Sequence, residues 1–426
     1  MKYTLISLSI FCILMSTSCH KKDMPSPEPC TNPPCDSTVV PKDTFMVWQI
    51  PMLPDFTYGF SMDPELHGDG LYFSNNLTGY GEPIHKVNKL TGQTLWNTNG
   101  SCKYQSSRSL GFYQKETKIV FKQEYCLNIR NDSDGFITGS IDFRIFPNGA
   151  CDPRMSGFGE WVFVNVIPYN EKKDSTTHHL TRINIETLEI DTLLAIFSED
   201  TYYPLVEAPS AYIESSGDTL LLFSNRSYSF KKGDGKVDFY CFNMTQKKLE
   251  WKKEDIEQTG IGAIYTPQIL GDKVYYQGSN EVFMFDIATG NKIWSRRFLG
   301  ESYYLTKHII AENKIFMFND GIGLRALNQS NGNTIWDKND AEYDGSLAGG
   351  LCYHNGNIYF IGGDQGYAAI YGIHANNGSR FWQYRTPNYK KYSSSTFGYI
   401  NMIADPETGY LYTGDGVFMM CLKPPK

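Results

Sequence analysis

The stretch GDKVYYQGSNEVFMFDIATGNKIW, residues 271–294, decides the fold because it recurs along the chain. ENKIFMFNDGIGLRALNQSNGNTIW at 312–336 and GNIYFIGGDQGYAAIYGIHANNGSRFW at 356–382 align with it. Earlier copies are GDGLYFSNNLTGYGEPIHKVNKLTGQTLW at 68–96 and, with a longer hairpin, GDTLLLFSNRSYSFKKGDGKVDFYCFNMTQKKLEW at 217–251. Self-similarity at a fixed period of roughly 20–50 residues indicates a repeat architecture.

Each copy reads as an apolar strand, a turn, a second strand, a second turn and a strand that carries tryptophan. The second turn has the form Asp286-x-x-Thr289-Gly290. Its glycine supplies a positive φ, and the Asp286 side chain can accept hydrogen bonds from the turn amides. The same pattern occurs at Asn88–Gly92, Asn328–Gly332 and His374–Gly378. A further strand precedes each copy, for example IYTPQIL at 264–270, which makes four strands per unit.

Four-stranded units that recur every 42–48 residues between tryptophans cannot bury both faces alone. In a radial arrangement each sheet covers its neighbour, which is the propeller solution. Residues 100–215 hold two units without the final tryptophan, and the count would fall to seven if one of these were an insertion. The second strands give a count of eight, near Tyr72, Ile119, Val162, Leu220, Val274, Ile315, Tyr359 and Leu411.

The two ends of the repeat region complement each other. The C-terminal GYLYTGDGVFMMCLK, residues 409–423, supplies a second and a third strand but ends before a tryptophan strand. TFMVWQIPM, residues 44–52, is an unmatched strand with Trp48 at the expected position. The sequence therefore predicts an all-β, eight-bladed β-propeller of four-stranded antiparallel blades over residues 44–426, closed by an N-terminal strand that completes the last blade.

Six tryptophans recur at one position in successive units. Side chains that repeat in this way fit inter-blade packing better than an exposed set of ligand-binding rings. Trp161 lies in another strand of a unit without the final tryptophan and is not included. We therefore predict a structural blade role for Trp48, Trp96, Trp251, Trp294, Trp336 and Trp382.

The first 43 residues are predicted to direct export and membrane attachment, and not to form part of the fold. Residues 1–18 have a basic start at Lys2, an apolar run and small residues before Cys19, which is the form of a signal peptide. Small residues directly before a cysteine resemble the bacterial lipoprotein cleavage box, so we predict lipid attachment at Cys19. The alternative is an ordinary cleaved signal and an incidental cysteine. Residues 19–43 contain six prolines and are predicted to be a semi-extended tether.

The cysteines are interpreted as structural. Cys30 and Cys35, in CTNPPC, have the spacing of a small disulfide loop in an oxidising compartment. Cys102 and Cys126 can also pair. Four further cysteines are predicted to be buried thiols, namely Cys151, Cys241, Cys352 and Cys421.

No residue pattern for catalysis, cofactor binding or metal binding emerges. The net charge of −7 is a poor match to a phosphate backbone, which excludes nucleic acid as a partner. Asp132-x-Asp134-Gly135 fits a hairpin turn better than a Ca²⁺ loop. His178 and His179 are interpreted as a solvent-exposed loop pair. C-x-x-C-H haem attachment is missing from the sequence.

The repeat closely resembles that of the pyrroloquinoline-quinone-like propellers, over roughly residues 44–423. One branch of that family, the quinoprotein alcohol dehydrogenases, is characterised by an adjacent pair of cysteines, which this sequence does not have. Another branch is the propeller lipoprotein of the outer-membrane β-barrel assembly machinery, which is non-catalytic. This second resemblance implies an exported outer-membrane lipoprotein, facing the periplasm or the cell surface, that contacts the membrane through its lipid only and binds a protein partner.

The leading hypothesis is therefore a non-enzymatic, membrane-tethered scaffold for protein–protein interaction, without a cofactor. Two alternatives stay open, because function depends on sites grafted onto a fold. One is a surface lipoprotein that binds glycans, peptides or another small ligand. The other is a quinone-dependent dehydrogenase, which the missing cysteine pair disfavours.

Overall fold

A computed structural model describes most of the chain after residue 43. The chain divides after Val39, and every described residue lies in the second unit, Val40–Lys426. The described ranges are 44–52, 60–75, 83–98, 111–123, 126–143, 150–167, 177–197, 203–229, 234–257, 266–278, 280–298, 308–319, 323–339, 350–363, 368–390, 397 and 401–425.

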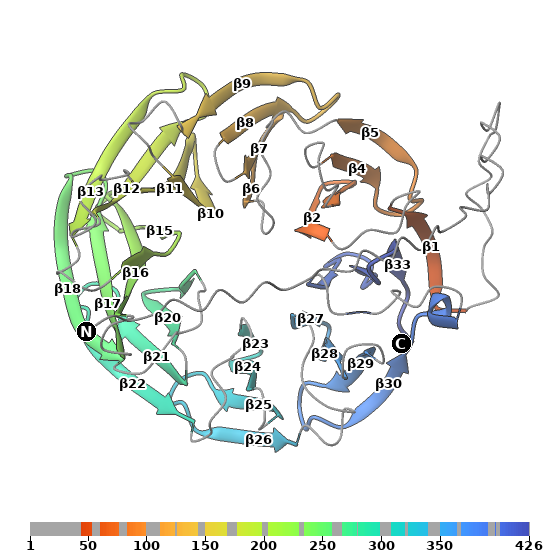
Figure 1. Ribbon diagram of the computed structural model, residues 1–426. Coiled ribbons are helices and arrows are strands. Elements are labelled where there is room, and N and C mark those ends of the chain that lie inside the picture. The colour runs from red at the N-terminus through yellow and green to blue at the C-terminus, as the bar shows by residue number, and fades with distance from the viewer. Residues whose placement is uncertain are drawn as a thin grey trace, which may run out of the picture. The chain divides into compact units, whose positions relative to one another are not determined.

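Eight antiparallel sheets form a ring (Figure 1), and each sheet is one blade. Within blades 1, 2, 3, 5, 6 and 7 the four strands follow chain order from the inside of the ring to its rim. Residues 100–215, which were ambiguous in sequence, contribute two complete blades. The prediction of eight blades is thereby confirmed.

The strands of blades 1 to 4 follow one another in chain order. They are β2 (Phe60–His67), β3 (Gly70–Asn75), β4 (Ile84–Asn88), β5 (Thr94–Thr98), β6 (Gly111–Lys115), β7 (Lys118–Gln123), β8 (Cys126–Asn131), β9 (Ile137–Asp142), β10 (Ala150–Phe158), β11 (Trp161–Ile167), β12 (Thr177–Asn184), β13 (Ile190–Phe197), β14 (Tyr203–Val206), β15 (Ser210–Ile213), β16 (Thr219–Ser229), β17 (Asp234–Asn243) and β18 (Lys248–Glu257). In blade 4 both β14 and β15 pair with β16.

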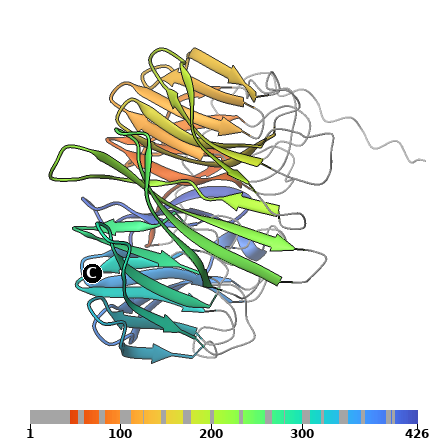
Figure 2. The same cartoon turned by 90° about the vertical axis from the view of Figure 1, so that its left-hand side faces the viewer.

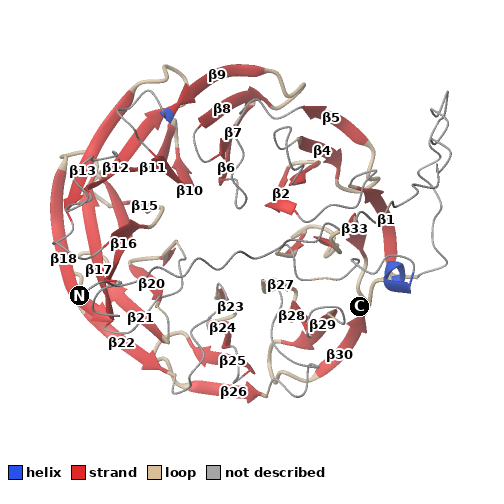
Figure 3. Ribbon diagram, in the orientation of Figure 1, coloured by secondary structure: helices blue, strands red, loops and turns tan. Residues whose placement is uncertain are grey.

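Blades 5 to 8 repeat the arrangement with shorter strands. They are β19 (Gln268–Leu270), β20 (Lys273–Gln277), β21 (Glu281–Asp286), β22 (Lys292–Arg297), β23 (Ile309–Ala311), β24 (Lys314–Asn319), β25 (Gly323–Asn328), β26 (Thr334–Lys338), β27 (Cys352–His354), β28 (Asn357–Gly362), β29 (Ala369–His374), β30 (Arg380–Tyr384), β31 (Ile403–Ala404), β32 (Leu411–Gly414), β33 (Phe418–Leu422) and β1 (Met46–Pro51). Helix within the described ranges is limited to short turns such as η3 (Pro387–Lys390) (Figure 3). None of these turns has the length or apolar character to cross a bilayer.

The N-terminal strand closes the ring as predicted. β1 pairs antiparallel with β33, and Trp48 lies opposite Cys421. The sheet order β1-β33-β32-β31 makes β1 the outer strand of blade 8. Because the first and last strands of the chain share one sheet, ring closure requires both ends of the propeller.

The core is distributed between the blades. The two middle strands of a blade are buried on both faces, as in β20, where Val274, Tyr275 and Tyr276 are at most 2% exposed. Among the described residues the apolar side chains form eight clusters, one for each pair of neighbouring blades. The junction of blades 5 and 6, for example, joins Met284 of β21 to Met317 of β24. Stability therefore depends on how well each blade fits the next.

Blade 4 differs from its neighbours in strand length. β16, β17 and β18 have 11, 10 and 10 residues, whereas β20, β21 and β22 of blade 5 have 5, 6 and 6. At about 3.4 Å per residue the additional residues lengthen this blade by roughly 15 Å. Figure 2 shows the long strands running across the side of the ring that faces the viewer.

Candidate functional site

The repeated tryptophans join each blade to the next by the same contact. The indole N–H donates to a backbone carbonyl in the outer turn of the following blade, at 2.8–3.1 Å. The ring also covers the glycine of that turn, and a Cβ added at Gly332 would lie 2.6 Å from the Trp294 ring. The five pairs are Trp48 with Gly92, Trp96 with Gly135, Trp251 with Gly290, Trp294 with Gly332 and Trp336 with Gly378. We call this pairing the Trp–Gly clasp.

The turn that receives the ring is preorganised by its own first residue. Asp286 Oδ1 accepts the Thr289 amide at 3.0 Å, and the Gly290 amide donates to the Asp286 carbonyl at 2.8 Å. Gly290 has φ +66°, a conformation that costs a residue with a side chain about 1 kcal/mol or more. Glycine therefore serves the turn twice, through its backbone freedom and through the space that it leaves for Trp251.

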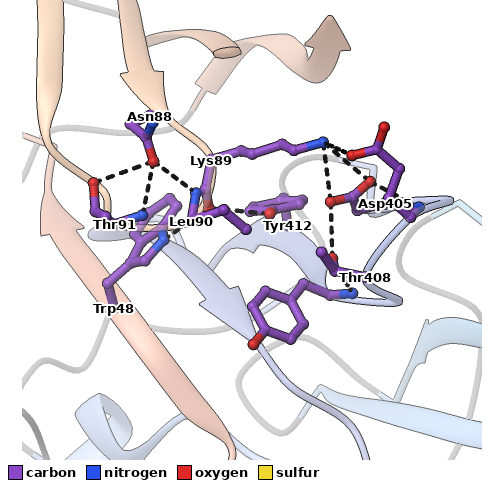
Figure 4. A network of polar contacts seen from close by, with 10 residues as sticks. Trp48, Asn88, Lys89, Leu90, Thr91, Asp405, Thr408 and Tyr412 are labelled. Carbon is purple, nitrogen blue, oxygen red and sulfur yellow. Dashed lines mark hydrogen bonds and ion pairs between the residues drawn. The ribbon is translucent and has the colours of Figure 1, made fainter. Parts of the chain in front are cut away.

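The clasp that closes the ring is reinforced by buried charge (Figure 4). Trp48 and the Tyr412 hydroxyl both donate to the Lys89 carbonyl at 3.0 Å. The Lys89 ammonium lies 3.2 Å from Asp405 and 2.9 Å from Glu407. Burial alone would lower the pKa of Lys89, but its hydrogen bonds to Glu407 and Asp405 outweigh burial and raise it.

Trp382 is the exception among the six tryptophans. Blade 8, which follows it, is completed by the two ends of the chain and has no turn between β33 and β1 to supply a carbonyl. The Trp382 indole nitrogen is buried and has no hydrogen-bond partner among the described residues. The ring packs edge-on against Phe45 instead, at 5.7 Å between centroids.

Blades 2 and 3 meet without a tryptophan. Gly139 of β9 stands eight positions after Asn131, where other blades have tryptophan. In blade 3, Leu188 takes the place of the turn glycine with φ +62°, and a Cβ at Gly139 would lie 3.0 Å from the Leu188 side chain. The large and the small residue have therefore exchanged sides of the junction.

Blades 3 and 4 are joined by ion pairs. Asp191 of β13 contacts Arg182 at 2.8 Å and Lys247 of the blade 4 turn at 3.0 Å. Lys247 occupies the glycine position of its turn with φ +52°. Nearer the inside of the ring, Arg154 of β10 holds the buried Glu207 through contacts of 2.7 and 2.8 Å. Charge thus replaces the Trp–Gly clasp at this junction.

Sequence reasoning missed both of these junctions, although a signal for them exists. The turn asparagine persists in the units without tryptophan, where Asn184 Oδ1 accepts the Thr187 amide at 3.0 Å. Asn131 and Asn243 begin the corresponding turns of blades 2 and 4. Counting onward from these asparagines finds Leu188 and Lys247 at the glycine position, four residues on, and Gly139 and Thr192 at the tryptophan position, eight residues on.

The other predicted residues divide into three groups. The turn at Asp132–Gly135 is confirmed as a hairpin between β8 and β9, and Cys241, Cys352 and Cys421 are confirmed as buried free thiols. Cys126 forms a disulfide, while Cys102 lies outside the described residues. The Cys151 side chain lies outside the described part of the structure. The signal peptide, the tether and the residues Cys19, Cys30 and Cys35 also lie outside the described residues.

The prediction of an exposed histidine pair was wrong. His178 and His179 lie in strand β12, and His178 is 4% exposed. The His178 Nδ1 lies 2.8 Å from the Asn165 side-chain amide. Strand β12 begins at Thr177, so alternation along the strand turns His178 inward. Within the described ranges no group of three or more His, Cys, Asp or Glu residues is arranged to hold a metal ion.

An open groove lies between the outer strands of blades 4 and 5, with a volume of about 530 Å³. A bulge in β18 forms one wall, because the register with β17 shifts between Lys253 and Glu257. Asp255, in the bulge, has φ +48°, and its amide donates to Asp238 at 3.1 Å. Bulges are common beside functional sites, where they redirect side chains. We call this feature the blade 4–5 groove.

Comparison with known proteins agrees with this architecture. A family model described as outer membrane protein assembly factor BamB matches residues 210–396, which contain β15 to β30 of blades 4 to 7. A comparison with curated proteins gives no match. The fold therefore defines the class, an eight-bladed β-propeller. Within that class the chain resembles the propellers of pyrroloquinoline-quinone-like repeats, and BamB among them.

Solved structures share the fold at low sequence identity. BamB from Moraxella catarrhalis is 12% identical with a TM-score of 0.55, and the match covers 89% of this chain and 97% of that one. Quinohemoprotein alcohol dehydrogenase from Comamonas testosteroni is 9% identical with a TM-score of 0.59, covering 89% and 77%. Saccharomyces cerevisiae Sqt1 is 9% identical with a TM-score of 0.60, covering 89% and 98%. At these identities the likeness establishes the fold alone.

Proposed function

We propose that the protein is a non-enzymatic propeller scaffold that mediates protein–protein interaction at the outer membrane. The match of residues 210–396 to the BamB family carries the proposal. This part of the chain contains the long strands of blade 4 and the blade 4–5 groove. The groove, which is a candidate surface for binding a partner, therefore lies within the matched region.

The internal chemistry of the described blades is consistent with a scaffold. The recurring polar groups of the repeat form hydrogen bonds within the ring. The Trp294 indole N–H donates to the Gln329 carbonyl, and Asp286 accepts a hydrogen bond from an amide of its own turn. The buried ion pair of Arg154 and Glu207 ties blade 3 to blade 4. Groups engaged in this way hold the blades in place and leave the outer strands as recognition surfaces.

The proposal includes the export and the lipid attachment predicted from the sequence. A lipid on Cys19 would anchor the chain, and the proline-rich residues 19–43 would hold the propeller away from the membrane. Replacing Cys19 by alanine is expected to release the protein from the membrane fraction while its thermal unfolding is unchanged. Retention of Cys19→Ala in outer membranes would show that the lipid is not the anchor.

The test of function is in-cell cross-linking of a tagged full-length chain, followed by purification from outer membranes and identification of the cross-linked proteins. Recovery of barrel-assembly components is the expected result. Reproducible recovery of nutrient-uptake transporters, or of no protein, would overturn it and favour capture of a soluble ligand. Thermal shift against a glycan panel, and dye reduction with added quinone and Ca²⁺, would then examine the two alternatives directly.

A further inference from the structure

We propose that the blade 4–5 groove binds a carboxylate-bearing, extended segment of a partner protein. The proposal rests on the scaffold function proposed above and names the kind of partner that this surface fits. The groove lies between two outer strands, since β18 and β22 are each last in the sheet order of their blade. An outermost strand offers backbone groups to an added extended segment.

One wall of the groove is fixed by a neutralised lysine. Lys252 lies 2.9 Å from both Asp238 and Glu254, and its ammonium is 5.5 Å from the centre of the Tyr240 ring. Burial alone would lower the pKa of Lys252, but the hydrogen bonds to Glu254 and Asp238 outweigh it and raise the pKa. Lys252 is therefore a structural cation whose charge is already balanced.

Two further lysines face the groove with their charge unbalanced. Neither Lys253 nor Lys292 forms an ion pair with any carboxylate in the described part of the chain. The Lys253 side chain runs over Gly290, where an added Cβ would lie 2.6 Å from Cε. The Lys292 ammonium lies 5.9 Å from the centre of the Phe283 ring. In a chain of net charge −7, two such ammonium groups across one groove select an anion.

The remaining lining distinguishes a peptide from a simple anion. Ile256 adds apolar surface, which an inorganic anion would not use. Asp255 also lines the groove, and its carboxylate disfavours a multiply charged phosphate while it can accept a peptide N–H. Three lysines and the carboxylates of Glu254 and Asp255 line the groove. Because Lys252 is paired with Glu254, two unpaired cations, one further carboxylate and apolar surface remain, and this mixture fits an extended segment in which acidic and apolar residues alternate.

Strand β22 extends the positive charge beyond the groove. Its sequence KIWSRR contains Lys292, Arg296 and Arg297 and no acidic residue. All three are exposed, and none forms an ion pair with a described carboxylate. Such a cationic rim would accelerate the approach of an acidic segment and make its binding dependent on salt.

The experiment uses the full chain and a labelled short peptide of alternating valine and glutamate, with glutamine and lysine versions as comparison probes, followed by fluorescence anisotropy. We expect binding of the glutamate peptide only, weakened by added salt. The double variant Lys253→Glu/Lys292→Glu should raise the Kd about tenfold or more, since two attractive contacts become repulsive. Lys253→Gln/Lys292→Gln should have an intermediate effect.

The matched control is Lys115→Glu/Lys423→Glu, which makes the same change of charge at two lysines outside the groove and should leave the Kd within about twofold. Equal binding of the glutamine peptide, or an unchanged Kd in the groove variant, would overturn the proposal. So would sedimentation with phosphatidylglycerol vesicles that is lost in the groove variant while no peptide binds. If the groove variant still cross-links to barrel-assembly components in cells, the groove proposal fails and the scaffold function stands.

Discussion

At the junctions from blade 4 to blade 7 a tryptophan on one side enters the space left by a glycine on the other, whereas blades 2, 3 and 4 meet without the repeated tryptophan. Gly139 faces Leu188 at the first of these two junctions, and Asp191 faces Lys247 at the second. The turn backbone is nevertheless the same, with a positive φ at Leu188 and at Lys247.

This difference shows what two neighbouring blades require of each other. Their side chains must together fill the junction and balance its charge, but the residue type on either side can vary. A large residue against a small one fills the space in both orientations, as Trp96 with Gly135 and Gly139 with Leu188 show. Cores tolerate exchanges that keep total volume, and lose stability when volume is removed or added. The tryptophan-free junctions are therefore alternative solutions, and mutations can test how far the two kinds are interchangeable.

Removal of a clasp should have the largest effect. Trp96 is 7% exposed, donates to the Asp132 carbonyl at 2.8 Å and lies 6.2 Å from the Tyr72 ring. We expect Trp96→Ala to lower the free energy of unfolding by about 3–5 kcal/mol, through lost burial and a cavity. Urea unfolding followed by circular dichroism measures it. Leu95→Ala, at a neighbouring side chain that is 44% exposed, is the control and should cost less than about 1 kcal/mol. A loss equal to that of the control would mean that the clasp contributes no stability.

A second test asks whether the large and the small residue of a Trp–Gly clasp can change sides of the junction. Trp96→Gly and Gly135→Leu would copy the junction of blades 2 and 3 onto that of blades 1 and 2. Each single change should destabilise, because one leaves a cavity and the other places a side chain 2.8 Å from the Trp96 ring at φ +73°. Together they should recover about 1–3 kcal/mol relative to the sum of the single changes, measured in a double-mutant cycle. Additive losses would contradict the exchange of volume.

The units that carry the repeated tryptophan were predictable from the sequence, and the junctions without it were not. The strand pattern and the turns at Asp286 and Asn328 are local, so they predicted the blades and the closure by Trp48. The exchange of Gly139 with Leu188 is a relation between two blades, and neither residue is unusual alone. A prediction of that pair needs the spacing from the turn asparagine and the assumption of a ring.

The groove was not predictable for a related reason. Lys253 and Lys292 resemble the lysines that commonly protect exposed strand edges. Their placement across one groove depends on the bulge at Asp255, which breaks the regular alternation of β18. A positive φ at an aspartate is invisible in a pattern of strand residues. His178 was misplaced for a comparable reason, because the start of β12 could not be located in sequence.

The ionic junction of blades 3 and 4 should respond to solution conditions, unlike a Trp–Gly clasp. Hydrogen bonds from Lys247 and Arg182 hold the pKa of Asp191 below its ordinary value, so the carboxylate stabilises the fold above the unfolded-state pKa of about 4. Asp191→Asn should cost about 1 kcal/mol at neutral pH and low salt. The difference from wild type should shrink as the pH falls below about 4, through the folded pKa, and also at high salt.

The same pH and salt series on Trp96→Ala serves as the comparison, because burial of an indole does not titrate. Its difference from wild type should stay constant while that of Asp191→Asn declines. If the loss in Asp191→Asn were unaffected by both salt and acid, the ion pair would not be what stabilises this junction. The stacking of the Arg182 guanidinium on the Trp161 ring, with Cζ 4.2 Å from the ring centroid, would then be the main contact.

The smallest effect should come from Lys247→Gly. This change removes the lysine of the ionic junction and restores the turn glycine that is found in a Trp–Gly clasp. Glycine relieves the positive φ of 52°, worth about 1–2 kcal/mol, but it adds freedom to the unfolded chain at a cost of about 0.5–1 kcal/mol. The change also removes the 3.0 Å contact with Asp191, which is worth less than about 1 kcal/mol because Lys247 is 59% exposed. At low salt these terms nearly cancel, so unfolding in urea should match wild type.

At high salt the ion pair is screened and the backbone term remains, so Lys247→Gly should become the more stable protein by about 0.5 kcal/mol. A variant that is less stable than wild type at every salt concentration would show that the lysine contributes to this junction by more than its charge.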